Sequence, residues 1–260
     1  MRSAEPSDAA AVVDLIGESF DPAFVQRTIF GCAGVQRFLA GQYSLALSLR
    51  SPTYYVTCAG ATVVGYAEIN RKTDTDCFLN YIAVATDRRG SALGSRLLLA
   101  ALFASGCSPH GRLELDVVVG SAARAWYERM GLQAISPITW WESRDWTTSS
   151  TEGSGFVFDL AQAEAVHERF GFSEIRVGTR ANPRKVGRLG ESYFRVDDSI
   201  IADDDCTAAL RSLDSARSLL LIKEGLDSPN DRGRWTPVVR LVRMAATLGE
   251  VISALTRLVS

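Results

Sequence analysis

The spacing of apolar residues divides the first 146 residues into helices and strands. Apolar positions that recur every three or four residues indicate helices, and alternation rich in β-branched and aromatic residues indicates strands. Ser7 is the expected N-cap of the first helix, and Gly106 and Gly131 are the expected ends of two later helices. In chain order the pattern predicts two helical regions, three strands, a helix, a strand, a short helix and closing strands, over residues 9–20, 22–48, 53–58, 62–69, 77–85, 91–106, 112–119, 121–131 and 132–143.

The second half follows a similar order after a polar segment rich in Ser, Thr and Gly, which is the expected linker at 147–155. It is predicted to contain three short strands, a helix, a buried strand and a long C-terminal helix, over residues 173–180, 184–190, 192–198, 206–216, 218–222 and from 241 onward. Leu241, Leu248 and Leu255 repeat every seven residues along that last helix. Such a stripe indicates either a helix that faces the core or a homodimer contact.

These patterns predict an α/β protein in which a mixed, mostly antiparallel sheet is flanked by helices over residues 1–146. A smaller accessory α/β domain is expected over 156–260. Its element order repeats that of the first half, and "AEAVHERFGF" (163–172) is similar to "ARAWYERMGL" (123–132). A degenerate duplication would explain both observations, and chance similarity between two amphipathic helix ends is the alternative.

Composition narrows the classes of function. The formal net charge is −2, so no general basic field attracts nucleic acid, and that partner is not expected. The five cysteines are scattered without a CxxC spacing and there are two histidines, so neither a disulfide framework nor a metal site is predicted. No segment has the pattern of a signal peptide or membrane span, which indicates a cytoplasmic protein. The strong preference for arginine over lysine is typical of a GC-rich bacterial genome.

Three other features are expected to be structural. His167 stands alone on its predicted helix and is expected at the surface. The tryptophans at 140, 141 and 146 are expected in core packing, with the wall of an acceptor site as the alternative. The basic run at 176–190 is expected to be a solvated hairpin, with phosphate or RNA contact as the alternative, and the aspartates at 197–205 are expected to cap a helix.

One junction indicates chemistry. Residues 79–98 read "LNYIAVATDRRGSALGSRLL", an apolar strand followed by two arginines and then by small residues that begin a helix. The first amides of a helix have no partner within the helix, and the helix N-terminus is electropositive. Glycine and alanine allow a phosphate to approach these amides closely, and an arginine adds a formal charge. The junction is therefore either a tight turn or a phosphate site.

The segment "RRGSALG" resembles the cofactor loop of the GNAT N-acetyltransferase superfamily. A second segment, "LDVVVGSAARAWYERMGL", resembles the family's following strand and helix, with Ala123 and Tyr127 at the matching spacing. The resemblance covers about residues 1–146 and implies a GNAT-like fold there. The chain departs from the family pattern at several positions. Ala92 replaces a glycine, Thr86 or Asp87 stands in the usual proline region, Gly120 replaces an asparagine and Leu132 replaces a phenylalanine. Asn80 stands near the position where a glutamate is often the general base.

The resemblance implies that acetyl-CoA is the cosubstrate and that Tyr127 protonates the leaving thiolate. It also implies that backbone amides around 82–84 stabilise the charge that develops on the carbonyl oxygen. The base is left open between Glu68, Glu114, Asp116 and a relay through water. The residues expected to bind the cofactor are Ile82, Ala83, Val84, Arg89, Gly90, Ser91, Ala92, Gly94, Ser95 and Ser121.

The predicted function is transfer of an acetyl or other acyl group from acyl-CoA to a primary amine on a small molecule or peptide. Two alternatives remain: a CoA-binding module without catalysis, acting as a scaffold or regulator, and an acetyltransferase that acts on RNA or aminoacyl-tRNA. The acceptor, the acyl chain preference and the role of residues 156–260 are not defined by the sequence.

Overall fold

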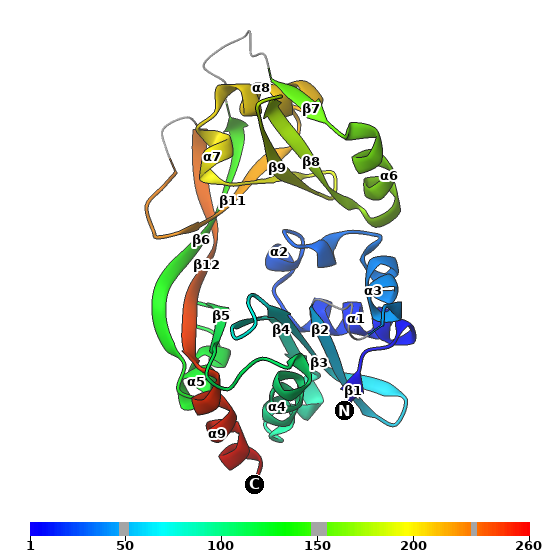
Figure 1. Cartoon of the computed structure of the whole chain (residues 1–260), viewed down its shortest axis with the longest axis vertical. Helices are drawn as coiled ribbons and strands as arrows, with labels where there is room; N and C mark the ends of the chain where they lie inside the picture. Colours follow the sequence, from blue (N-terminus) through cyan, green and yellow to red (C-terminus); the bar gives the residue numbers. More distant parts are fainter. Residues whose placement is uncertain (47–51, 147–154, 230–232) are drawn as a thin grey trace. The chain divides into compact units, whose positions relative to one another are not determined.

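The computed structural model describes residues 1–46, 52–146, 155–229 and 233–260, and it divides into two compact units that are discontinuous along the chain (Figure 1). Unit 1 comprises Met1–Pro22, Gln36–Ser136 and Leu241–Ser260, and unit 2 comprises Ala23–Val35 and Pro137–Arg240. This grouping differs from the predicted contiguous division at 146, because two long strands and one internal segment connect the units. The predicted linker lies outside the described residues except for Gly155.

Unit 1 contains a sheet in the order β1-β2-β3-β4-β5-β12, in which β4 and β5 are parallel and the other neighbours are antiparallel. Figure 1 shows α1 and α3 on one side of β2–β4 and α4 on the other. Most or all residues of the following elements belong to unit 1: β1 (Arg2–Ser3), the 3-10 turn η1 (Pro6–Asp8), α1 (Ala9–Ser19), α3 (Val35–Ser44), β2 (Thr53–Ala59), β3 (Thr62–Arg71), β4 (Cys77–Val84), the 3-10 turn η4 (Thr86–Arg88), α4 (Leu93–Ser105), β5 (Arg112–Val118), α5 (Ala122–Arg129) and α9 (Leu248–Val259).

Unit 2 contains a second sheet in the order β7-β8-β9-β10-β11-β6-β12, in which β10 and β11 are the parallel pair. Its three predicted short strands are β8, β9 and β10, and its predicted buried strand is β11. The remaining elements are α2 (Pro22–Val25), the 3-10 turn η2 (Ile29–Gly31), β6 (Gln133–Trp146), β7 (Phe156–Phe158), α6 (Leu160–Phe170), β8 (Phe172–Thr179), β9 (Asn182–Leu189), β10 (Tyr193–Val196), α7 (Asp198–Ile201), α8 (Asp204–Leu213), β11 (Ser218–Glu224) and β12 (Gly233–Thr247).

The two units repeat one element order, three antiparallel strands followed by a helical segment and a parallel strand, so the predicted GNAT-like repeat is present. The two similar sequence segments, 123–132 and 163–172, do not occupy equivalent positions in this repeat. Residues 123–132 cover α5, which follows the parallel strand of unit 1, whereas residues 163–172 cover α6, which precedes the strands of unit 2. The similarity of the two segments therefore reflects amphipathic helix ends rather than equivalent positions.

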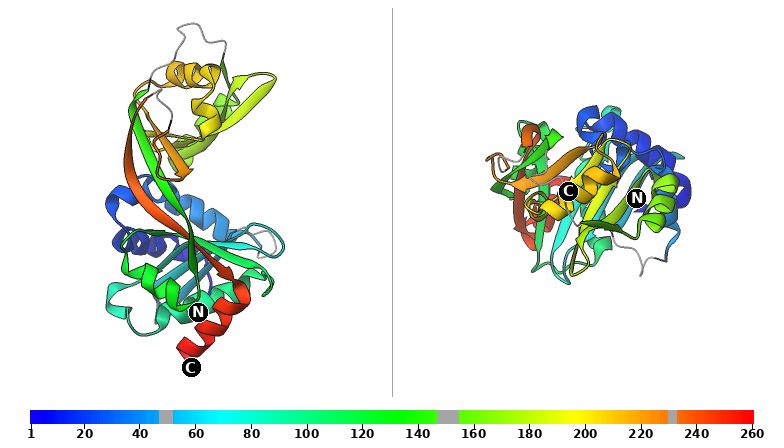
Figure 2. Two further views of the ribbon diagram at one scale, coloured as in Figure 1. Left: turned by 90° about the vertical axis from the view of Figure 1, so that its left-hand side faces the viewer. Right: turned by 90° about the horizontal axis from the view of Figure 1, so that it is seen from above.

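The strands β6 and β12 pass from one unit to the other (Figure 2). Residues 241–247 of β12 pair with β5 in unit 1, and residues 138–143 of β6 pair with β11 in unit 2. The segment 23–35 leaves unit 1 after α1 and folds with unit 2, where Arg27 and Glu142 form a buried ion pair of 2.6 Å. The chain therefore crosses between the units four times.

The predicted long C-terminal helix is wrong in its first part, because residues 233–247 form strand β12. Thr247 ends the strand and begins the helix: its hydroxyl accepts from the backbone of Glu250, and the Glu250 carboxylate accepts in return. Leu248 and Leu255 are 0% exposed and pack in the core of unit 1. The apolar stripe thus faces the core. A similar correction applies to the first helix, where Ser7 lies inside η1 and the Asp8 carboxylate accepts from the Glu5 backbone instead.

We expect the core-facing side of α9 to be essential for stability. Leu255→Ala removes a fully buried side chain and should lower the free energy of unfolding by about 2–5 kcal/mol, as measured by urea denaturation. Leu258, four-tenths exposed on the same helix, is the matched control, and Leu258→Ala should change it by less than about 0.5 kcal/mol. Equal effects of the two substitutions would contradict this packing.

Candidate acyl-transfer site

The parallel pair of unit 1 separates partway along its length. Strand β4 pairs with β5 only from Cys77 to Leu79, although β4 continues to Val84. Beyond Leu79 that edge of β4 has no strand partner within the described residues, while the other edge stays paired with β3. The backbone groups of a strand without a neighbour can hydrogen-bond an extended ligand. The predicted residues Ile82, Ala83 and Val84 all lie on this stretch.

The loop after β4 leads to an open helix N-terminus. The first intrahelical bond of α4 runs from the Arg96 amide to the Ala92 carbonyl at 3.0 Å, so the three preceding helical amides, at 93–95, have no intrahelical acceptor. No side chain caps this helix. Arg89 is exposed, and its Nε donates to the Val84 carbonyl at 3.1 Å, which ties the loop back to the strand. The geometry suits an anion.

Two residues of this loop have left-handed backbone conformations. Gly90 has φ 78° and Ala92 has φ 59°. A residue with a Cβ is disfavoured in this region, which explains why the family pattern has a glycine where this chain has Ala92. Ser91 is exposed, and its hydroxyl donates to the Arg88 carbonyl at 2.6 Å. The predicted loop residues are thus brought together around the start of α4.

Helix α5 lies beside the start of α4. Trp126 Nε1 donates to the Ser95 hydroxyl at 3.3 Å, and an atom added at Gly94 would lie 3.6 Å from the Trp126 ring. Tyr127 is 6% exposed and belongs to the core cluster on the α4 side. Its hydroxyl has no hydrogen-bond partner among the described residues, and burial raises the pKa of Tyr127 well above its usual value. A tyrosine that keeps its proton can act as an acid. Ser121, the N-cap residue of α5, has a buried hydroxyl without a partner in the described part of the chain.

The second group of polar residues lies on the opposite face of β3. The Glu68 carboxylate is buried and accepts from the Tyr66 hydroxyl at 2.7 Å and from Asn80 Nδ2 at 2.8 Å. Burial raises the pKa of Glu68, and these two donors partly offset that effect. The structure therefore joins the candidate base Glu68 to Asn80, the residue near the family's usual base position.

The other two acidic candidates are held in ion pairs. Both oxygens of Asp116 accept from Arg243, at 2.8 and 2.9 Å. Glu114 contacts Lys72 at 2.8 Å and Arg112 at 3.4 Å, and the Lys72 ammonium holds the pKa of Glu114 below its usual value. A carboxylate that is stabilised by a cation is a weak proton acceptor. Glu68 has no such cationic partner among the described residues, and burial raises its pKa.

Unit 2 lacks both features of the site in unit 1. All four residues of β10, from Tyr193 to Val196, pair with β11, so the parallel strands do not separate along β10. The following helix is capped by Asp197, whose carboxylate accepts from the Ser199 and Ile200 amides. Asp203 caps α8 in the same way, at Cys206. The aspartates act as predicted for helix caps, and their negative charge occupies the positions that a phosphate would need.

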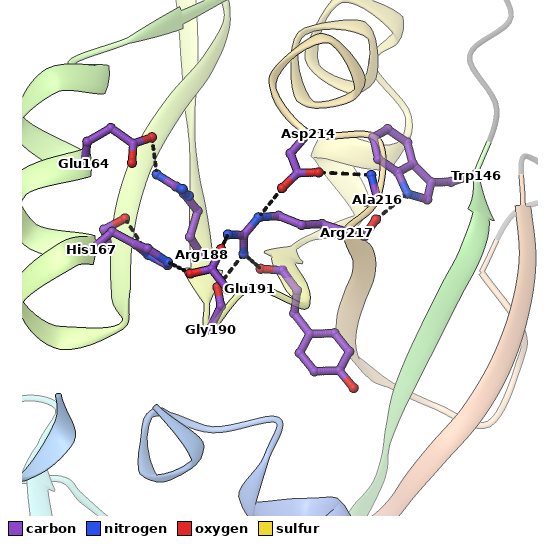
Figure 3. A network of polar contacts seen from close by, with 11 residues as sticks. Trp146, Glu164, His167, Arg188, Gly190, Glu191, Asp214, Ala216 and Arg217 are labelled. Carbon is purple, nitrogen blue, oxygen red and sulfur yellow. Dashed lines mark hydrogen bonds and ion pairs between the residues drawn. The ribbon is translucent and has the colours of Figure 1, made fainter. Parts of the chain in front are cut away.

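A buried polar network in unit 2 was not predicted from the sequence (Figure 3). Arg217 is 1% exposed and binds Asp214, Glu191 and the Gly190 carbonyl. His167, expected at the surface, is 6% exposed and contacts Glu191 at 3.2 Å. The surface prediction for His167 is wrong: its ring is buried and contacts Ser173 of β8 at 3.4 Å as well as Glu191 in the turn after β9. The same network includes an ion pair of 2.7 Å between Arg188 and Glu164.

The described ranges contain neither a candidate metal cluster nor a candidate membrane-spanning helix. Those residues contain no group of three or more His, Cys, Asp or Glu side chains that could hold a metal ion. They also contain no helix that is long and apolar enough to cross a bilayer.

The separated parallel strands, the uncapped helix and the repeated element order define the α/β fold of this chain. Residues 50–133 match the family model of the acetyltransferase (GNAT) domain. No curated protein sequence matches significantly.

Solved structures share the whole fold at low identity. A tandem GNAT protein from the clavulanic acid biosynthesis pathway is 14% identical, with a TM-score of 0.66 over 95% of this chain and 98% of that chain. A GCN5-related N-acetyltransferase from Sphaerobacter thermophilus is 13% identical, with a TM-score of 0.60 over 95% of each chain. Two GNAT-like halves in tandem are thus the architecture of this chain.

The left-handed backbone at Ala92 predicts that substitution by glycine increases the stability of the folded protein. Ala92→Gly relieves the strain of the Cβ, whereas Ala85→Gly, at φ −50° in the same loop, only adds freedom to the unfolded chain. The free energy of unfolding of the first variant should exceed that of the second by about 1 kcal/mol in denaturant titrations. The reverse order would contradict the loop conformation.

The buried His167 predicts a pH dependence of stability. Burial, followed by the charge of Arg188, lowers the pKa of His167 in the folded protein. The unfolded chain therefore binds a proton more readily, and stability should fall as the pH decreases from about 6.5 toward the folded pKa. His167→Gln should flatten this slope in thermal unfolding between pH 7.5 and 5.5, with His110→Gln as the exposed-site control. An unchanged slope in His167→Gln would contradict the buried placement.

Proposed function

We propose that the chain is an N-acyltransferase that moves an acyl group, acetyl first among the candidates, from acyl-CoA to a primary amine. The observation that carries the proposal is the separation of β4 from β5 after Leu79 beside the uncapped N-terminus of α4. The exposed strand edge suits the pantetheine arm, and the open amides with Arg89 suit the pyrophosphate. Unit 2, with paired strands and aspartate caps, has neither.

The two chemical roles fall on opposite faces of the sheet. Glu68, on the face away from α4, would accept the proton of the amine. Tyr127, on the α4 side, would donate a proton to the thiolate of the leaving group. The backbone amides of 82–84 would stabilise the charge on the carbonyl oxygen. The buried Glu68 carboxylate has only neutral hydrogen-bond donors, so an approaching ammonium group supplies the missing opposite charge.

An RNA acceptor is less favoured by the charges of unit 2. Four of the five basic residues of the 176–190 run are paired with carboxylates, at distances of 2.7–3.7 Å: Arg176 with Asp159, Arg184 with Asp203, Lys185 with Glu174 and Arg188 with Glu164. Paired cations release few counterions on binding a phosphate backbone. This observation supports a small-molecule or peptide amine.

The proposal is tested by turnover of acetyl-CoA over a panel of primary amines. Tyr127→Phe and Glu68→Gln should each lower kcat by about 10²-fold or more, because each removes a proton-transfer group. The Kd for acetyl-CoA, measured by calorimetry, should stay within about twofold of the parent in both.

Two results would separate the alternatives. Binding of acetyl-CoA without turnover of any amine would favour a CoA-binding scaffold. Turnover that is unaffected by either substitution would contradict the assigned acid and base. Asp116→Asn serves as a control for loss of a carboxylate outside the proposed base.

A further inference from the structure

Asn80 lies at a bulge in strand β4. Glu68 of β3 is opposite Tyr81, and the next residue, Ile69, is opposite Leu79, so Asn80 is the extra residue on β4. The bulge falls directly after Leu79, where β4 ceases to pair with β5. Bulges redirect side chains and end pairing, and they occur often beside active sites. Here the bulge both opens the strand pair and turns Asn80 toward Glu68.

The amide of Asn80 has a defined orientation. Its Nδ2 lies 2.8 Å from Glu68 Oε1, and an ionised carboxylate can only accept, so the NH2 group faces Glu68. The amide oxygen of Asn80 has no hydrogen bond to any described residue. The second Glu68 oxygen is occupied by the Tyr66 hydroxyl at 2.7 Å.

The remaining titratable groups around Glu68 are neutral phenols. Tyr66 is on the same strand as Glu68, Tyr54 of β2 and Tyr81 of β4 are opposite Glu68 in the two ladders, and Tyr43 of α3 interacts with both Tyr66 and Glu68. No charged side chain among the described residues contributes to the electrostatics of Glu68. Asn80 is therefore the one polar group of β4 that both orients this carboxylate and keeps a free acceptor.

We propose that Asn80 is a positioning residue for acyl transfer, which holds Glu68 through its NH2 group and accepts an N–H of the substrate amine through its carbonyl oxygen. The inference rests on the proposed function. The substrate class that fits is a primary amine, whose ammonium group has N–H donors for both oxygens.

The reaction balances on these groups. The ammonium transfers one proton to the Glu68 carboxylate, which leaves a neutral amine held by Asn80. The amine nitrogen forms a bond to the thioester carbonyl carbon, the carbon–sulfur bond breaks, and the thiolate takes a proton from Tyr127. The bonded nitrogen is then cationic and releases its second N–H proton to solvent, from which the Tyr127 phenolate takes a proton back. The products are the N-acyl amine, free CoA and a protonated Glu68, which returns its proton to solvent, so the net release is one proton.

An isosteric exchange tests the pair. Glu68→Gln alone should abolish most turnover, and Asn80→Asp alone should place two carboxylates together, so that one retains a proton and activity shifts to higher pH. The double variant E68Q/N80D restores one carboxylate and one amide with the side-chain lengths unchanged. Its kcat should be at least tenfold higher than that of Glu68→Gln.

The pH profile of kcat/KM provides a readout that a structural role would not move. Asn80→Ala removes a donor that stabilises the ionised carboxylate, so the acidic limb should shift to higher pH. Asn70→Ala on β3 is the matched control and should leave that limb in place. Thermal unfolding and acetyl-CoA binding of each variant report folding separately.

The outcomes distinguish the two proposals. No turnover of any amine by the parent would overturn the proposed function itself, and full activity in Glu68→Gln would overturn the assignment of Glu68 as the base and with it the role of Asn80. Loss of activity in Glu68→Gln together with an unshifted profile in Asn80→Ala and no recovery in E68Q/N80D would overturn the role of Asn80 alone.

Discussion

The structure depends on the pairing of the end of β12 with β5. Residues 241–247 continue the sheet of unit 1, and α9 then covers its core with side chains such as Leu248 and Leu255. These residues come last in the chain, after all of unit 2. Because a sheet edge and an exposed core are both costly, unit 1 is incomplete until the C-terminus has been added. Unit 2 likewise needs β6 beside β11, and β6 is the strand that leads into it from unit 1.

The candidate site in unit 1 lies where β4 and β5 cease to pair, within a sheet whose other neighbouring strands remain paired. The bulge at Asn80 changes the direction of β4, and the parallel ladder ends at Leu79. From that point the strand has a free edge, and the loop beyond it leads to a helix without a cap. Backbone geometry thus creates the free strand edge and the open helix N-terminus, and the proposed base Glu68 and proposed acid Tyr127 lie on opposite faces of the sheet.

The sequence was sufficient for the elements whose signals are local. The loop around Gly90 and Gly94, the helix end at Gly106 and the strands β2–β5 and β8–β11 could be predicted from spacing and turn residues. The sequence did not reveal that residues 233–247 form a strand, because the heptad of Leu241 and Leu248 spans a strand and a helix whose boundary is set by Thr247 and Glu250. Long-range contacts were also hidden, such as those that bury His167 and join Asn80 to Glu68. Such contacts depend on which strands become neighbours, and a single sequence carries no signal for that.

The exchange of strands explains why a unit without the separated strands and open helix is retained. Unit 2 pairs all of β10 with β11 and closes its helix with Asp197, so it has neither the free strand edge nor the open helix N-terminus of unit 1. Its buried ion pairs and core nevertheless remain, because β12 and α9 follow it in the chain and unit 1 cannot do without them. Selection for a folded unit 1 is therefore also selection for a folded unit 2. A folded unit 2 therefore contributes to the stability of unit 1, although its own strands lack the separated geometry of β4 and β5.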